Sequence, residues 1–585
     1  MPLARSLKPE KHKMRPRDGD VRRINKIISP VSKQRVTKRH SFAEMDRLPS
    51  ALLSEVLSHL CGRELAVAAQ TSQQLRAAAA DAARLRCLAL RLPLSELPDS
   101  PWSASAALRY VELLRRRTIA AGITHTLWCI HGRLFASGSD ANWKNDLSAL
   151  GFASEQEAKE AIAQRPPSDP SVGADEGPDP GSDLVNLPNK IGIGYMAPVL
   201  SLAAVRIVEV ATGSSHSLAV TSEGTVYSFG SNEYGQLGMG EKSAASFGPQ
   251  VVAAGSLASL RARRVSCGDL YSLVIDAGGL LHGFGTNAHG ETGVGYASAA
   301  DDYSDSMEAV DHVDYVPGGC EPTPIRSVVT DMIADAAAGR GHTLLLLLDG
   351  RVASFGRNDY GQLGRGRIEA FSAKKSGKKG FSETPAIIDT GNDGWGTRPV
   401  VSIACGRNHS IAADDYGCVF AWGCNLGGQA AASSADSEER RLPQLLAQFP
   451  MSDSLGRPRV LMVAAAISHS LILTDVGVWS KGDGCPPCSS KVRRLVFSSD
   501  DQPWLHSPTF IAAGGHHSIL AADELFPPRI LSWGGASEGQ CGYGVGLGLN
   551  VSSMGSIGEV GFGDLCGMQR RPRRVPVPTS GSSGS

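Results

Sequence analysis

An imidazole side chain recurs along this chain of 585 residues, usually three positions after a glycine, with tyrosine in its place once. Imidazoles bind metal ions or transfer protons, but either chemistry needs several groups within a few ångströms of one another. Each copy lies in a separate repeat of one sequence unit, so we expect the fold to space these side chains apart. We therefore predict that these anchor residues are structural and hydrogen-bond the backbone between strands, because buried polar groups are nearly always hydrogen-bonded. The pairs of preceding residue and anchor are Gly122 with His125, Gly213 with His216, Gly268 with Tyr271, Gly339 with His342, Gly406 with His409, Ala466 with His469, and Gly514 with His517.

The rest of the sequence offers no catalytic constellation. Cys485 and Cys488 form a C-x-x-C pair, but without a second pair or nearby histidines this spacing predicts a loop rather than a zinc site. The glycine-rich residues 542–548 lack the strand-to-helix context of a dinucleotide-binding turn, and the Walker pattern is absent. The other cysteines are scattered, which is typical of reduced thiols inside the cell. We predict no catalytic residue, no metal and no cofactor.

The anchors lie inside seven copies of a longer unit, which is clearest from Val208 to Gly238. A recurring unit of this length is the sequence signature of a repeat architecture. Apolar residues alternate with small or polar ones around Gly224, which predicts two strands and a turn between Leu218 and Phe229. The Gly- and Asn-rich sequence from Asn232 to Gly238 predicts the turn that leads toward the next unit. Seven such units closed into a ring would protect their strand edges, and we expect Arg570 to Val577 to supply the strand that seals it.

These units resemble the regulator of chromosome condensation repeats, and the resemblance extends over residues 118–577. The family fold is a seven-bladed β-propeller, so the resemblance implies a mainly β domain with seven blades. Residues between the units are expected in loops at the rim, where repeat proteins often bind their partners. Residues 301–314 are acidic and residues 365–379 are basic, and such loops either steer a partner or keep the surface soluble. The insertions are residues 142–201, 296–330, 365–399 and 432–459.

Charge is balanced over the whole chain, with 58 basic and 58 acidic residues, so nothing implies a general affinity for nucleic acid or membranes. Residues 1–41 are an exception, because Lys and Arg dominate there without apolar periodicity. This composition predicts a disordered basic tail, with nuclear import or weak contact with nucleic-acid phosphates as alternatives. Residues 578–585 are expected to form a second disordered tail. The sequence has no apolar stretch of about eighteen residues and no secretory signal, so we expect an intracellular protein, cytoplasmic or nuclear.

Residues 42–91 have helical character, with apolar residues on one face at helical spacing. A helical module of this size is usually too small to be stable without a partner. The pattern resembles an F-box, in which Leu-Pro is followed by apolar residues at fixed offsets, and residues 92–117 are predicted to form a linker and a connecting helix. In that family the apolar face binds a Skp-type adaptor, whereas the plain structural alternative packs this face on the propeller. The matching positions are Leu48, Pro49, Leu52, Val56, Leu57, Leu60, Leu65, Ser72 and Leu75.

The two resemblances together predict a substrate receptor without catalytic activity of its own. An F-box implies assembly with a Skp-type adaptor and a cullin complex, and the propeller would capture a protein for ubiquitin transfer by a separate subunit. The repeat family implies an alternative, which is guanine-nucleotide exchange on a small Ran-like GTPase. A plant-type ultraviolet receptor is disfavoured, because the turns that carry tryptophan in that family read GSSH, GRGH, GRNH and GGHH here. A general propeller scaffold is the fourth hypothesis.

Overall fold

The computed structural model describes the chain, with gaps, from residue 117 to residue 574. Contacts within the chain define two compact units, one formed by residues 1–112 with 451–456 and the other by residues 113–450 with 457–585. All described residues lie in the second unit, so the predicted basic tail, F-box-like module and C-terminal tail lie outside them. The described residues are 117–140, 147–163, 184–187, 190–297, 320–366, 380–389, 395–396, 398–414, 417–430, 439–449, 460–474, 477–482, 489–495, 510–522, 529–535, 541 and 568–574.

Seven antiparallel sheets contain the described strands, and we number them as blades one to seven along the chain. In order from the inner to the outer edge, blade one holds β1 (Ile119–Ala121), β2 (His125–Ile130), β3 (Arg133–Ser139), β5 (Lys190–Pro198) and β4 (Leu184–Leu187). Blade two holds β6 (Ile207–Thr212), β7 (His216–Thr221), β8 (Val226–Asn232) and β9 (Ser243–Val251). Blade three holds β10 (Ala262–Cys267), β11 (Tyr271–Asp276), β12 (Leu281–Thr286) and β13 (Cys320–Arg326). Blade four holds β14 (Ile333–Ala338), β15 (His342–Leu347), β16 (Val352–Arg357) and β17 (Phe381–Ile387). Blade five holds β18 (Val400–Cys405), β19 (His409–Asp414), β20 (Cys418–Cys424) and β21 (Glu439–Gln448). Blade six holds β22 (Val460–Ala465), β23 (His469–Thr474), β24 (Gly477–Gly482) and β25 (Ser489–Arg494). Blade seven holds β26 (Phe510–Ala513), β27 (His517–Ala522), β28 (Arg529–Gly535) and β29 (Met568–Arg574).

Helical structure in the described part is short and lies between strands. Helix α7 (Glu155–Ala163) and the 3-10 helix η2 (Ser148–Leu150) are inserted in blade one, and η3 (Leu200–Leu202) and η4 (Gly255–Leu257) precede the inner strands of the next blades. No helix among the described residues is long and apolar enough to cross a membrane.

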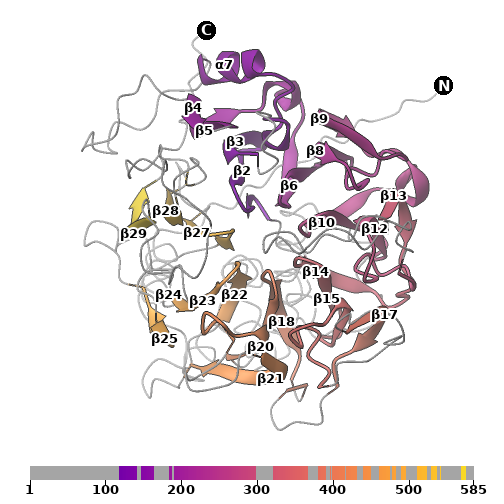
Figure 1. The fold of residues 1–585 in the computed structure, drawn as a ribbon, viewed down its shortest axis with the longest axis vertical. Helices are drawn as coiled ribbons and strands as arrows, with labels where there is room; N and C mark the ends of the chain where they lie inside the picture. Colours follow the sequence, from indigo (N-terminus) through magenta and orange to yellow (C-terminus); the bar gives the residue numbers. More distant parts are fainter. Residues whose placement is uncertain are drawn as a thin grey trace, which may run out of the picture. The chain divides into compact units, whose positions relative to one another are not determined.

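The blades close into a ring around a common axis (Figure 1). Neighbouring inner strands contact one another from β1 through β6, β10, β14, β18 and β22 to β26, and β26 contacts β1 again. The last joint is held by the amide of Gly515, which donates to the carbonyl oxygen of Gly122 at 2.9 Å. The predicted mainly β fold, a seven-bladed propeller, is therefore confirmed for the described residues.

Each blade has more strands than the two that the repeated unit predicts. The unit itself supplies three strands, and the outermost strand comes from residues expected to form rim loops, such as β13 within 296–330, β17 within 365–399 and β21 within 432–459. Blade one draws β4, β5 and α7 from residues 142–201. The outer strands escape sequence analysis because they are only partly covered, so apolar alternation is weak: β17 has a single buried residue, Ser382.

The predicted role of Arg570 to Val577 as the sealing strand is wrong. Strand β29 pairs with β28, with Leu531 opposite Arg574, and is the outer strand of blade seven. Every described blade is built from strands that are consecutive in the chain, apart from the order of β5 and β4 in blade one. No strand is shared between the first and last blades, so the ring closes through contacts between complete blades.

Apolar side chains fill the space between neighbouring blades. Leu218 and Val220 of blade two pack with Val265, Val274 and Phe284 of blade three. Because blades cover both faces of each second strand, these strands are buried over their whole length and form short continuous apolar runs.

The glycine before each anchor is required by a close approach between blades. A Cβ atom at Gly339 would lie 2.4 Å from Cε1 of His342 and 2.6 Å from the carbonyl oxygen of Gly406 in the next blade. Equivalent contacts of 2.3 and 2.6 Å surround Gly213. Blade six has Ala466 at this position, so its joint accommodates one methyl group.

We predict that Gly339→Ala lowers the free energy of unfolding by about 1–3 kcal/mol, because the added methyl group overpacks the joint. Gly341→Ala, two residues away in the same turn, is the control, because the nearest atom to its Cβ would be 3.6 Å away. Urea unfolding of both variants measures the difference. Equal stability of the two variants would contradict the close-packed joint.

Candidate functional site

The anchor residues begin the second strand of every blade, and all seven side chains are fully buried. The structure spaces them around the ring instead of bringing them together, and each contacts a hydroxyl group in the next blade. Backbone partners, as predicted, are also present: Tyr271 donates to the carbonyl oxygen of His342 at 2.7 Å, the backbone of Tyr271 hydrogen-bonds His216, and the backbone of His409 hydrogen-bonds His342. The side-chain contacts were not predicted. The side-chain contacts are His125 with Ser217 at 3.0 Å, His216 with Ser272 at 3.0 Å, Tyr271 with Thr343 at 2.9 Å, His342 with Ser410 at 3.1 Å, His409 with Ser470 at 2.9 Å, His469 with Ser518 at 2.8 Å and His517 with Thr126 at 2.9 Å.

The hydroxyl groups determine which imidazole nitrogen carries the proton. Ser272 donates its proton to the carbonyl oxygen of Gln236 at 2.8 Å, and Ser410 donates to the carbonyl oxygen of Gln362 at 2.8 Å. A hydroxyl has one proton to give, so Nε2 of His216 and of His342 must be the donor in each joint. The Nδ1 atoms then carry no proton, and they are buried without a hydrogen-bond partner among the described residues.

Burial keeps the six anchor imidazoles neutral. It lowers the pKa of His125 from 6.5 to about 4 and the pKa of each of the other five to about 3. A protonated imidazole would place a second N–H at Nδ1, where the described residues offer no acceptor. The anchors therefore act as hydrogen-bond donors and not as acids or bases near neutral pH.

Sequence analysis missed the hydroxyl partners and the loop carbonyl groups that accept from them, which in four joints belong to Ala149, Gln236, Glu291 and Gln362. The signal was present, because every anchor is followed directly by Ser or Thr. In the loop after β8, the side-chain oxygen of Gln236 accepts from the amide of Tyr234 at 2.8 Å, and that of Asn232 accepts from the amide of Leu237 at 3.1 Å. These buried side chains hold the loop so that the carbonyl oxygen of Gln236 faces Ser272 of the next blade.

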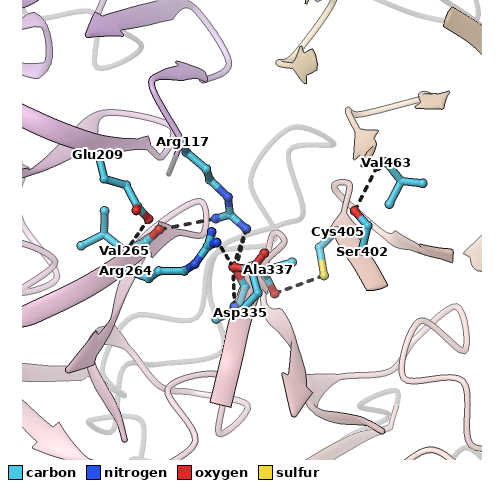
Figure 2. A network of polar contacts seen from close by, with 10 residues as sticks. Arg117, Glu209, Arg264, Val265, Asp335, Ala337, Ser402, Cys405 and Val463 are labelled. Carbon is cyan, nitrogen blue, oxygen red and sulfur yellow. Dashed lines mark hydrogen bonds and ion pairs between the residues drawn. The ribbon is translucent and has the colours of Figure 1, made fainter. Parts of the chain in front are cut away.

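A network of partly and fully buried charges links Arg117 to the inner strands of blades two, three and four (Figure 2). Arg117, at the end of the predicted linker, donates to the carboxylate of Asp335 at 2.9 Å and to the carbonyl oxygens of Ala336 at 3.0 Å and Val265 at 3.4 Å. Arg117 directly precedes blade one, whereas Val265 belongs to blade three and Asp335 to blade four. Because blades one and four are not neighbours, the guanidinium group reaches across the ring.

The network balances two cations with two acidic groups. Arg264 lies 3.5 Å from Asp335, and Glu209 accepts from the amide of Val265 at 3.2 Å. Burial raises the pKa of Glu209, while Arg264 and Arg117 oppose that rise. Loss of Arg117 would leave acidic groups buried with less compensation, which is strongly destabilising in proteins. The network therefore ties the start of the propeller to blades three and four.

The seven turns between first and second strands surround a cavity of about 170 Å³ on the axis, which we call the axial mouth. We call the glycine three positions before each anchor the ring glycine, which is Ala466 in blade six. These residues and their immediate neighbours, except Ser214, line the cavity, and Asp269, Arg340 and Arg407 are the charged residues among them. Backbone bonds fix these turns to one another, since Asp269 donates to Gly339 at 3.3 Å and Arg340 donates to Arg407 at 3.2 Å. The cavity is lined by all seven blades, so it exists only in the closed ring.

The axial mouth lies on the face from which the long insertions leave. His216 pairs with Gly230, so the anchor turn and the end of the third strand lie at the same end of blade two. In blade three, Thr286 pairs with Cys320, so the chain returns from its acidic insertion on this same face. This face therefore combines a cavity with the most variable parts of the sequence.

Blade three also holds a Ser–His–Asp chain that sequence analysis missed. Nδ1 of His282 lies 2.7 Å from Oγ of Ser256, and its Nε2 lies 3.0 Å from Asp276. Ser256 gives its hydroxyl proton to the carbonyl oxygen of Pro324 at 3.0 Å, so the imidazole is not placed to remove that proton. Although burial alone would raise the pKa of Asp276, the hydrogen bond from His282 lowers it. The chain fastens β13 to the blade and shows no activated nucleophile.

Several predicted sites lie outside the described residues. These are the adaptor-binding positions, from Leu48 to Leu75, and the pair Cys485 and Cys488. Within the described part, no group of three or more His, Cys, Asp or Glu residues is arranged to hold a metal ion.

Sequence comparison identifies the repeats. The family described as regulator of chromosome condensation (RCC1) repeat matches residues 207–236, 333–362 and 400–429, and a second form of that family matches residues 223–275 and 349–413. These matches show that residues 207–275 and 333–429 carry repeats of this type, within a chain whose described residues form a seven-bladed β-propeller.

Known proteins share this region with the chain. The ultraviolet-B receptor UVR8 of Arabidopsis thaliana is 27% identical over 299 residues, which cover 44% of this chain and 62% of the receptor. The human E3 ubiquitin-protein ligase HERC2 is 32% identical over 301 residues, which cover 50% of this chain and 5% of the ligase. The matches therefore span less than two thirds of either relative. A crystal structure of yeast RCC1 (Prp20) bound to Kap60 is 22% identical, covers 66% of this chain and 78% of the solved one, and superposes with a TM-score of 0.46.

We predict that the propeller loses stability steeply as the pH falls below about 6.5. The pKa of each anchor imidazole is lower in the folded state, at about 3 to 4, so the unfolded state binds more protons in this range. His409→Gln keeps an N–H donor but does not titrate, and should reduce the pH dependence by about 1.4 kcal/mol per pH unit. Urea unfolding between pH 7 and pH 5 measures the slope. His131→Asn, at an exposed position, is the control, and an unchanged slope in His409→Gln would contradict the prediction.

Proposed function

We propose that this protein is a non-catalytic substrate receptor, in which the propeller binds a protein and residues 42–91 recruit a Skp-type adaptor with its cullin complex. The observation that carries the binding role is the axial mouth, where all seven blades contribute a turn to one cavity. The anchor imidazoles are neutral and form hydrogen bonds between blades. Because they hold the ring together, they support a binding platform rather than a catalytic site. A ring of this kind supplies a rigid platform, and such platforms commonly present binding residues on their loops.

The ubiquitin part of the proposal rests on two similarities. Residues 48–75 resemble an F-box, and the propeller region is 32% identical to part of a protein named as an E3 ubiquitin-protein ligase. The match covers 5% of that ligase, so the ligase activity itself is not carried over. We propose that a separate subunit performs ubiquitin transfer and that the protein acts in the cytoplasm or nucleus.

Guanine-nucleotide exchange on a Ran-like GTPase is the competing function implied by the repeat family. It needs no adaptor, so the two functions separate in one set of experiments. Accelerated release of labelled guanine nucleotide from a Ran-like GTPase, with no adaptor bound, would favour exchange over the receptor role.

We predict that the full-length protein co-purifies with a Skp-type adaptor and a cullin, and that the triple variant Leu48→Ala, Leu52→Ala and Leu57→Ala loses both. Removing three apolar side chains takes away the contact area that holds the adaptor. Affinity purification with quantitative mass spectrometry gives the measurement.

The matched control changes three leucines outside the motif positions, Leu85→Ala, Leu88→Ala and Leu90→Ala. This control should retain the adaptor. Adaptor binding by the first triple variant, or none by the unaltered protein, would refute the proposed assembly.

A further inference from the structure

Two arginines stand at the axial mouth in neighbouring blades. Arg340 and Arg407 each directly follow a ring glycine, in blades four and five, and both are partly exposed to the cavity. The Nε atom of Arg407 is buried and has no hydrogen-bond partner among the described residues, although buried polar atoms usually have one.

The acidic groups nearby do not neutralise this side of the mouth. Asp269 is the only acid in the cavity lining, and it interacts electrostatically with Arg407, Arg340 and Arg357. Arg357 already forms an ion pair with Asp359. Asp269 therefore supplies at most one negative charge against the two arginines of the lining. The lining therefore has an excess of positive charge on blades four and five.

The opposite side of the mouth is apolar. At the position occupied by Arg340 and Arg407, blade one has Ile123, blade six has Ile467 and blade seven has Gly515. A ligand that enters the cavity therefore meets guanidinium groups on one side and aliphatic side chains on the other.

We propose that the axial mouth binds an acidic segment of a partner protein, in which a carboxylate side chain pairs with Arg340 and Arg407 beside an apolar side chain that contacts Ile123 and Ile467. The inference rests on the proposed role of the propeller as a protein-binding platform, and it names the face and the chemistry of the bound segment. Arginine suits this role because its planar guanidinium group pairs with a carboxylate through two parallel hydrogen bonds.

A nucleic acid fits the same mouth less well. Binding to a phosphate backbone uses a stripe of several cations, and each contact adds to the affinity. The cavity lining offers two arginines and one acid, Asp269, and the cavity has a volume of about 170 Å³. A cavity of this size admits a side chain and not a duplex.

The test begins with a displayed library of random twelve-residue peptides, selected on the full-length protein. We expect enrichment of Asp or Glu next to an apolar residue. The best peptide, labelled with fluorescein, is then titrated by fluorescence anisotropy, and its Glu→Gln and Asp→Asn form is titrated beside it. The double variant Arg340→Gln and Arg407→Gln should weaken binding of the acidic peptide at least about tenfold.

Arg351→Gln is the matched control, because Arg351 lies in blade four at the opposite end of the strands and is exposed. It should bind the peptide like the unaltered protein, and urea unfolding should show that all three proteins are folded. Three results would each overturn the inference: enrichment without acidic residues, equal binding by the double variant, or displacement of the peptide by a lower concentration of a DNA duplex.

Adaptor co-purification with the double variant separates this inference from the proposed function. Retained adaptor with lost peptide binding supports both. Peptide binding through the two arginines in a protein that recruits no adaptor would reject the ubiquitin role and keep the acidic-segment site.

Discussion

The propeller depends on one hydrogen-bonded joint that is repeated between neighbouring blades. In the joint between blades two and three, the imidazole of His216 donates to Ser272, which donates to the carbonyl oxygen of Gln236. Both ends of this chain belong to blade two, so a strand and a loop of one blade hold a single hydroxyl of the next. The hydroxyl of Ser272 has both a donor and an acceptor in this chain, and removing one partner of a buried hydrogen bond is costly. The joint thus allows complete blades to close without a shared strand.

The same joint decides which residues are available for function. The ring glycine leaves room for the imidazole, and the anchor contact does not use the side chain of the residue after that glycine. Ser214, at this position in blade two, donates to the carbonyl oxygen of Asp269 at 2.6 Å. Arg340, Arg407 and Ile467 occupy that position in three successive blades. The chemistry of the axial mouth can therefore change from blade to blade while the ring stays the same. Arg117 also holds the ring together independently of the anchors, because it joins the start of blade one to Asp335 and Ala336 of blade four.

Sequence reasoning succeeds where a physical requirement repeats and fails where it does not. The repeated step of a small residue and a hydrogen-bonding ring located all seven anchors, although Tyr271 replaces histidine in one joint and Ala466 replaces glycine in another. The outer strand β17 and its counterparts were interpreted as loops, since a half-covered strand does not need strong apolar alternation. The partners of Arg117 lie 148 to 219 residues away, so no local pattern signals them. The mouth itself was missed, because its lining comes from seven turns between residues 121 and 515 that no local pattern joins.

The central claim is that neutral imidazoles donate through Nε2 from blade to blade. Nitrogen-15 NMR of the protein labelled at histidine measures the tautomer and the protonation state directly, and single His→Gln variants assign the signals. The account predicts the Nε2–H tautomer for His125, His216, His342, His409, His469 and His517 at pH 7, and no protonation at pH 5. Nδ1–H tautomers, or imidazoles that titrate near pH 6.5, would contradict it.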